Sequence, residues 1–108
     1  MAVTREFRHT IQARARADAR YRAAMLTEAI NELLAGDLAT GKAMLRDYVN
    51  ATITFDRLAE ATGIPPKSLQ RMLGPKGNPT AGNLFAVIKA LQDAEHITLA
   101  VKPTRHAA

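Results

Sequence analysis

The residues best suited to molecular recognition lie between positions 65 and 79, where the chain has no acidic residue. The segment holds three cations and three neutral hydrogen-bonding residues: Lys67, Arg71, Lys76, Ser68, Gln70 and Asn78. Lysine and arginine pair with phosphate and with the O6 and N7 atoms of guanine, and glutamine pairs with adenine. These residue types therefore suit a polyanionic partner such as nucleic acid.

The charge of the whole chain agrees with such a partner but is unevenly distributed. The 108 residues carry a formal net charge of +5, and the pI is about 10.1. Residues 1–22 hold six arginines against two acids, whereas residues 23–64 hold three basic residues against six acidic ones. Because the basic and acidic residues are separated, one surface can bind phosphates and another can bind a different partner.

The sequence lacks the patterns of catalytic and metal-binding sites. The chain has no cysteine, so neither a disulfide nor a thiolate metal site can form. Its three histidines fall on different expected elements without metal-ligand spacing. Asp56 and Glu60 are one helical turn apart, but the adjacent Arg57 favours surface charges over a catalytic pair. We expect neither an enzyme nor a bound metal or cofactor.

Length and hydropathy predict one water-soluble domain. A chain of 108 residues can bury a single helical core. No apolar run approaches the roughly 20 residues that span a membrane, and the start Met-Ala-Val-Thr-Arg-Glu leads into polar sequence. We expect a cytoplasmic protein without a membrane partner.

Three helices are predicted before the basic segment. An Ala- and Arg-rich stretch over residues 4–19 favours a helix with few apolar residues to bury. Apolar residues recur at helical spacing from Asp18, and Gly36 is placed for a left-handed C-terminal cap. Asp37 can then cap a third helix that ends near Asn50.

The basic segment itself is predicted to follow a short helix and a glycine turn. The hydroxyl of Thr54 can cap this short helix, and Gly63 can supply the positive φ of the turn. Two prolines can open the next helix, residues 66–73, because a first-turn position needs no N–H. Thr80 can cap a last helix after a loop rich in glycine and proline.

The C-terminal tail alternates strictly between polar and apolar residues. Ile97, Leu99 and Val101 fall on one side of an extended chain, which predicts a β-strand. A lone strand has unpaired edges, so it pairs across a dimer axis or with a partner chain, or the segment packs on its own domain. Residues 103–108 are expected to be disordered.

A short helix, a glycine turn and a basic second helix have helix-turn-helix geometry, although two packed helices of any bundle share that spacing. The sequence Phe55-Asp-Arg-Leu-Ala-Glu-Ala-Thr-Gly-Ile-Pro-Pro-Lys-Ser-Leu-Gln-Arg-Met-Leu, followed by Gly77-Asn-Pro-Thr, resembles the lambda-repressor-like (XRE-type) helix-turn-helix family. More narrowly, it is similar to antidote-type regulators of toxin-antitoxin addiction modules. In these the Leu-Ala-x-x-Thr-Gly turn, the Ser-Leu recognition helix and the Gly-Asn-Pro-Thr loop recur.

The resemblance implies an all-α fold, a helical bundle with a lambda-repressor-like helix-turn-helix, to which the alternating tail adds one C-terminal β-strand. The domain organisation that follows is a basic N-terminal helix or arm (1–20), a helix-turn-helix domain (21–102, motif about 54–73) and a disordered tail (103–108). The arginine-rich N-terminus has three open interpretations: an arm along DNA, a helix that embraces a second subunit, or a solvated helix face.

The resemblance also implies a role for each polar residue of the motif. The start of the recognition helix meets base edges in the major groove, which assigns base contacts to Lys67, Ser68 and Arg71, with Gln70 as a fourth. Phosphate contacts are assigned to Thr54, Lys76 and Asn78. Phe55 and Pro66 stand where relatives with well-defined operators often have a polar residue, which predicts narrow or weak base recognition.

The function implied is sequence-specific binding of double-stranded DNA by a homodimeric transcription repressor, because one helix-turn-helix reads only a few base pairs. The antidote resemblance adds a toxin protein as a candidate partner, with the acidic second and third helices as its contact if the toxin is basic. The alternative is a protein-binding module that keeps this fold and has lost DNA affinity.

Overall fold

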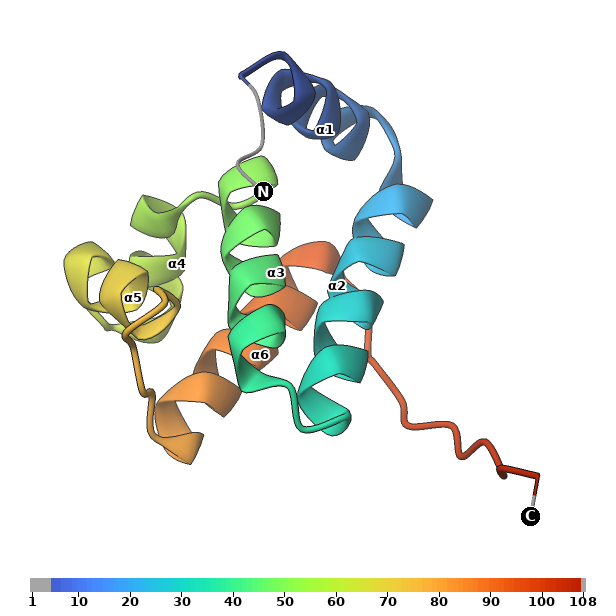
Figure 1. The fold of residues 1–108 in the computed structure, drawn as a ribbon. Coiled ribbons are helices and arrows are strands. Elements are labelled where there is room, and N and C mark those ends of the chain that lie inside the picture. The colour runs from blue at the N-terminus through green and yellow to red at the C-terminus, as the bar shows by residue number, and fades with distance from the viewer. Residues whose placement is uncertain (1–4, 108) are drawn as a thin grey trace.

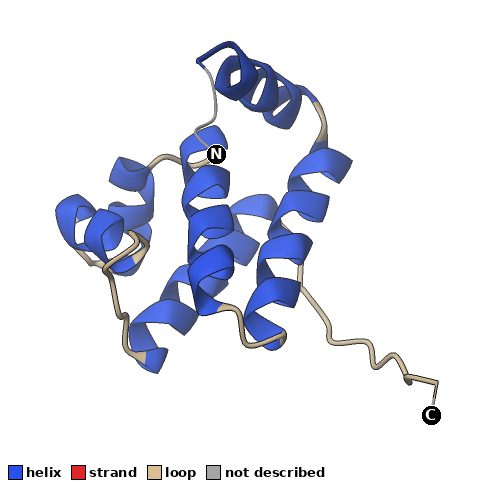
Figure 2. Ribbon diagram, in the orientation of Figure 1, coloured by secondary structure: helices blue, strands red, loops and turns tan. Residues whose placement is uncertain are grey.

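The computed structural model describes residues 5–107, and over that range its regular secondary structure is entirely helical (Figure 1; Figure 2). The helices are α1 (Arg5–Ala17), α2 (Ala19–Leu34), α3 (Leu38–Ala51), α4 (Phe55–Thr62), α5 (Pro66–Met72) and α6 (Ala81–Glu95). The predicted all-α class is therefore confirmed. None of these helices is long and apolar enough to cross a membrane.

Helices α2 and α3 form an antiparallel hairpin whose ends are set by local capping (Figure 1). Gly36 has a φ of 86°, and the Asp37 carboxylate accepts hydrogen bonds from the amide and the hydroxyl of Thr40. Both predicted caps are thus confirmed. Farther along the hairpin, Gly41 is buried against Leu33, where a Cβ atom would overlap the leucine side chain, so glycine permits the two helices to approach closely.

The second half of the fold consists of α4, α5 and α6. Gly63 adopts a left-handed conformation with a φ of 74° and turns the chain between α4 and α5, as predicted. Pro66 occupies the first turn of α5, and the Thr80 hydroxyl accepts a hydrogen bond from the Asn83 amide at 3.1 Å to cap α6. These two expectations are also confirmed.

One hydrophobic core joins the two halves. Its fully buried members come from every helix from α2 to α6: Leu26, Ala29, Leu45, Val49, Leu58, Leu69, Leu73, Val87 and Leu91. Leu73 directly follows the last residue of α5 and belongs to the same core. The core therefore fixes α5 against the rest of the fold while its outer face stays exposed.

The predicted C-terminal β-strand is wrong, because residues 97–107 contain no strand and the structure describes no neighbouring strand in residues 5–107. Ile97 and Leu99 are partly buried against the core, and the Leu99 amide donates to the Gln92 side-chain oxygen at 2.8 Å. Val101 is 77% exposed. As far as Leu99 the extended chain lies on the helices and turns Ile97 and Leu99 toward them, which needs no strand partner, and Val101 takes no part in this packing.

Candidate nucleic-acid interface

Helix α5 exposes the face that carries the predicted base contacts. Leu69 is fully buried, whereas Lys67, Gln70 and Arg71 are exposed and Ser68 is partly exposed. Since residues three and four apart share a helix face, burial of Leu69 toward the core turns its neighbours in sequence toward solvent. The outer face of α5 therefore offers two cations and two neutral hydrogen-bonding groups.

A polar groove lies beside α5, between this helix, the loop over residues 73–80 and the start of α6. Its volume is about 400 Å³, and its lining includes Ser68, Arg71, Lys76, Asn78 and Asn83. No carboxylate is among the lining residues, so the groove has an uncompensated positive charge. Such a groove suits an anionic chain that passes along the helix.

The groove brings together only part of the predicted site. Ser68, Arg71, Lys76 and Asn78 line it, whereas Lys67 and Gln70 lie on α5 outside it, and Thr54 lies at the start of α4. Asn83 was not predicted, although its position in the first turn of α6, after the Thr80 cap, is a signal in the sequence. Its backbone amide donates to the Thr80 hydroxyl, so its side-chain amide is the group that can bind a phosphate oxygen.

Thr54 does not cap α4 through its side chain, so that expectation is wrong. Its backbone has a φ of 73° and a ψ of 156°, a conformation that is found almost only in glycine. The cause is the turn after α3, in which the Thr54 amide donates to the Val49 carbonyl at 2.9 Å. The hydroxyl is consequently released from capping, and the residue is exposed.

Two cations of α3 hold the loop that follows α5, and sequence reasoning missed both. Lys42 is only 5% exposed, and its Nζ donates to the carbonyl of Gly74 at 3.1 Å and to that of Gly77. Arg46 donates through Nη1 to the carbonyl of Leu73 at 3.0 Å. Carbonyls at a helix C-terminus carry partial negative charge, which favours cations there.

A signal for this anchor is present in the sequence. Lys42 precedes the buried Leu45 by three residues and the buried Val49 by seven, so it lies on the apolar stripe of α3. A cation on such a stripe must find polar partners within the fold. Here the partners are backbone carbonyls of the loop.

Gly77 completes the attachment of the loop. A Cβ atom at this position would overlap the carbonyl oxygens of Arg71 and Met72, so only glycine lets the loop fold back onto the end of α5. The Gly77 amide also donates to the Gly74 carbonyl at 3.0 Å. The loop that presents Lys76 and Asn78 is therefore tightly held.

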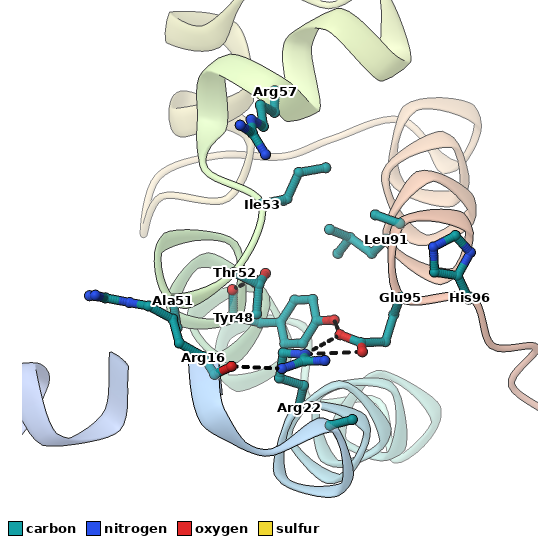
Figure 3. A pocket seen from close by; sticks show the side chains of 12 residues that line it. Arg16, Arg22, Tyr48, Ala51, Thr52, Ile53, Arg57, Leu91, Glu95 and His96 are labelled. Carbon is teal, nitrogen blue, oxygen red and sulfur yellow. Dashed lines mark hydrogen bonds and ion pairs between the residues drawn. The ribbon is translucent and has the colours of Figure 1, made fainter. Parts of the chain in front are cut away.

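A second polar cluster lies on the other side of the core, where α2, α3 and α6 meet (Figure 3). The Arg22 Nε donates to both oxygens of Glu95 at 2.9 and 3.0 Å, and the Tyr48 hydroxyl donates to the same carboxylate at 2.8 Å. Burial and the Glu95 carboxylate raise the pKa of Tyr48, and the hydrogen bond to Glu95 raises the pKa of Arg22. No local sequence pattern indicates this cluster, since its members are far apart along the chain.

No family model, curated protein or solved structure matches the chain. Within residues 5–107, no three histidine, aspartate or glutamate side chains are grouped so that they could hold a metal ion. The chemistry of α5 and the polar groove is therefore what indicates a function for this protein.

Proposed function

We propose that the protein is a transcription regulator of the lambda-repressor-like helix-turn-helix type that binds duplex DNA through α5. The observation that carries this proposal is the cationic outer face of α5 beside an acid-free polar groove. A helix of this width fits the major groove, where lysine and arginine recognise guanine and glutamine recognises adenine.

The residues divide into two groups on this proposal. Lys67, Gln70 and Arg71 contact base edges, with Ser68 at the border of the groove. The phosphate contacts are made by Lys76 and Asn78 in the groove and by Thr54 at the start of α4. Asn83 adds a further phosphate contact. The first group reads the DNA sequence, and the second group positions α5 in the major groove.

The proposal includes a homodimer on two half-sites, because one helix-turn-helix covers too few base pairs for useful specificity. The proposal takes repression of its own gene as the simplest regulatory role and takes the protein to be cytoplasmic. A basic toxin is a further candidate partner, since α2 and α3 expose the acidic residues Glu28 and Asp47. The homodimer, the repression, the location and the toxin partner can each prove wrong while the proposal of DNA binding stands.

Fluorescence anisotropy with the fragment upstream of the gene and a scrambled duplex, each at two salt concentrations, tests the proposal. Tighter binding to the upstream fragment that persists at the higher salt is expected. The double variant Lys67→Glu/Arg71→Glu should lose at least about thirtyfold in affinity, since each base contact contributes roughly 1–3 kcal/mol.

The matched control is Lys102→Glu/Arg105→Glu, which makes the same change in net charge on exposed residues of the C-terminal segment. It should lose much less affinity, because it alters only the long-range field. Equal losses in both double variants would reduce the interface to a basic surface without specificity. Absence of binding to either duplex would favour the protein-binding module.

A further inference from the structure

A second cavity, of about 460 Å³, lies where α1, α2 and the end of α6 meet the turn between α3 and α4 (Figure 3). Its lining shares no residue with the polar groove beside α5. Cavities of roughly 300–1,000 Å³ are typical of small-molecule sites. The volume is therefore large enough for a compact organic ligand.

The polar part of the lining is cationic. Arg16, Arg22 and Arg57 come from α1, α2 and α4, and Glu95 is the one carboxylate among the lining residues. Both oxygens of Glu95 already accept hydrogen bonds from the Nε of Arg22. Glu95 therefore compensates Arg22 and leaves the charges of Arg16 and Arg57 without a counter-ion in the cavity.

Arg57 is the guanidinium best placed to receive a ligand. In the part of the chain that the structure describes, it forms neither an ion pair nor a side-chain hydrogen bond. Figure 3 shows its side chain extending from α4 toward Ile53, with Ile53 and Leu91 between Arg57 and the Arg22–Glu95 pair. A planar guanidinium binds a carboxylate through two parallel hydrogen bonds.

The apolar part of the lining that solvent reaches consists of Ala19, Ile53 and Ala94, whereas Ala51 and Leu91 are buried. Tyr48, Thr52 and His96 complete the lining. An inorganic anion would leave the apolar wall in contact with water, whereas an organic anion would cover it and gain free energy from apolar burial. The combination of a free guanidinium with an apolar wall therefore selects an anion with a hydrocarbon body.

We propose that this cavity binds a small organic carboxylate, with the carboxylate paired to Arg57 and its apolar body packed against Ile53 and Ala94. The Arg22–Glu95–Tyr48 cluster forms the far wall and holds α2, α3 and α6 in place around the ligand. Because Arg57 belongs to α4, such a ligand joins the first helix of the proposed DNA-binding motif to the rest of the fold. The binding itself does not rest on DNA recognition.

The test is a titration of the ¹⁵N-labelled full chain with benzoate, followed by amide chemical shifts. Saturable shifts confined to residues 51–57 and 94–96 are expected. Benzyl alcohol, which has the same ring without the charge, and inorganic phosphate, which has charge without the ring, should each bind at least about tenfold more weakly. Equal binding of either probe would overturn the proposal.

Arg57→Met should weaken benzoate binding at least about fivefold, and Arg57→Lys should lose less, because it keeps a cation. The matched control is Arg20→Met, an exposed arginine of α2 outside the cavity, which should bind benzoate as the wild type does. The amide spectra of all three variants report whether they remain folded. Unchanged binding in folded Arg57→Met would show that benzoate does not use the cavity. None of these measurements requires DNA, so their failure is distinct from failure of the proposed function.

Discussion

The ammonium group of Lys42 in α3 donates a hydrogen bond of 3.1 Å to the carbonyl of Gly74, in the loop that follows α5. Its charge is buried and faces backbone dipoles, so it is not offered to a ligand in solvent. Together with Arg46, Lys42 fixes the end of α5 and the loop that carries Lys76. We therefore assign Lys42 a positioning role toward the proposed DNA interface.

Lys42→Met tests this role because it keeps the aliphatic stem and removes the donors. The free energy of unfolding, measured in urea, should fall by about 1–3 kcal/mol, since the Gly77 carbonyl loses its donor and the Gly74 carbonyl keeps only the Gly77 amide. Hydrogen exchange at residues 74–77 should accelerate. DNA affinity should fall with little change in its salt dependence, because Lys42 contacts no phosphate.

Lys89→Met is the control for Lys42→Met. Lys89 forms an exposed ion pair with Asp93 on α6, and its loss should change the free energy of unfolding by less than about 0.5–1 kcal/mol. Similar losses in the two variants would contradict an anchoring role for Lys42.

Gly77→Ala and Gly82→Ala should change stability in opposite directions. At Gly77 a Cβ atom overlaps the carbonyls of Arg71 and Met72, so the loop must move and both stability and DNA affinity should decrease. At Gly82, in the first turn of α6, a Cβ atom meets no atom within 4 Å. Alanine at position 82 should raise the free energy of unfolding by roughly 0.5–1 kcal/mol, because its helix propensity is higher than that of glycine. Thermal unfolding measures this difference in stability between the two variants. A lower melting temperature for Gly82→Ala would contradict the open space beside Gly82.

Thr54→Gly should stabilise the protein. The conformation of Thr54 costs a β-branched residue about 1–3 kcal/mol, and the gain is reduced by the greater freedom of glycine in the unfolded chain. A net gain of about 1 kcal/mol should raise the melting temperature by roughly 4–8 °C.

Thr80→Gly provides the contrast for Thr54→Gly. Thr80 has ordinary extended backbone angles and caps α6 through its hydroxyl, so glycine there should lower stability slightly. If Thr54→Gly also lowers the melting temperature, Thr54 is not strained in the folded protein.

Tyr48 should make stability fall in alkaline solution. Burial, followed by the hydrogen bond to Glu95, raises its pKa above the ordinary value of 10.0. The unfolded chain therefore ionises first, so this contribution is complete below about pH 10 and is lost as the pH rises toward the pKa of the folded protein.

Tyr48→Phe isolates this contribution, because Tyr21 and the other titrating groups are common to both proteins. At neutral pH the variant should be less stable by about 1 kcal/mol, since the hydrogen bond to Glu95 is lost. The difference in free energy of unfolding should shrink above pH 10, the ordinary pKa. If the free energies of unfolding of the two proteins differ by the same amount at every pH, the result would contradict a raised pKa of Tyr48 in the folded protein.

Most helix ends could be predicted because the residues that set them act locally. Asp37 and Thr80 accept hydrogen bonds from amides within three residues, and Gly36 and Gly63 supply a positive φ at one position. Thr54 has the residue type of a cap, but a bond from its amide to Val49 sets its backbone instead. That bond belongs to the turn after α3, which capping preferences do not describe.

The outer face of α5 could also be predicted, because burial of Leu69 determines which of its neighbours are exposed. The supports of this face could not, because they depend on contacts across the fold. Lys42 reaches carbonyls 32 and 35 residues later in the chain, and Tyr48 meets Glu95 across the core. For the tail, a period of two identified an extended chain but not whether another strand lies beside it.

The separation between Lys42 and its acceptors has a consequence for the order of folding. The α2–α3 hairpin is complete in sequence at Ala51, before Gly74 and Gly77 have been synthesised, so its contacts can form first on the ribosome. At that stage the Lys42 ammonium is hydrated, and arrival of the loop must strip away this water. We therefore expect docking of the α4–α6 half to be the late, cooperative step of folding, and Lys42→Met to alter the rate of that step more than formation of the hairpin.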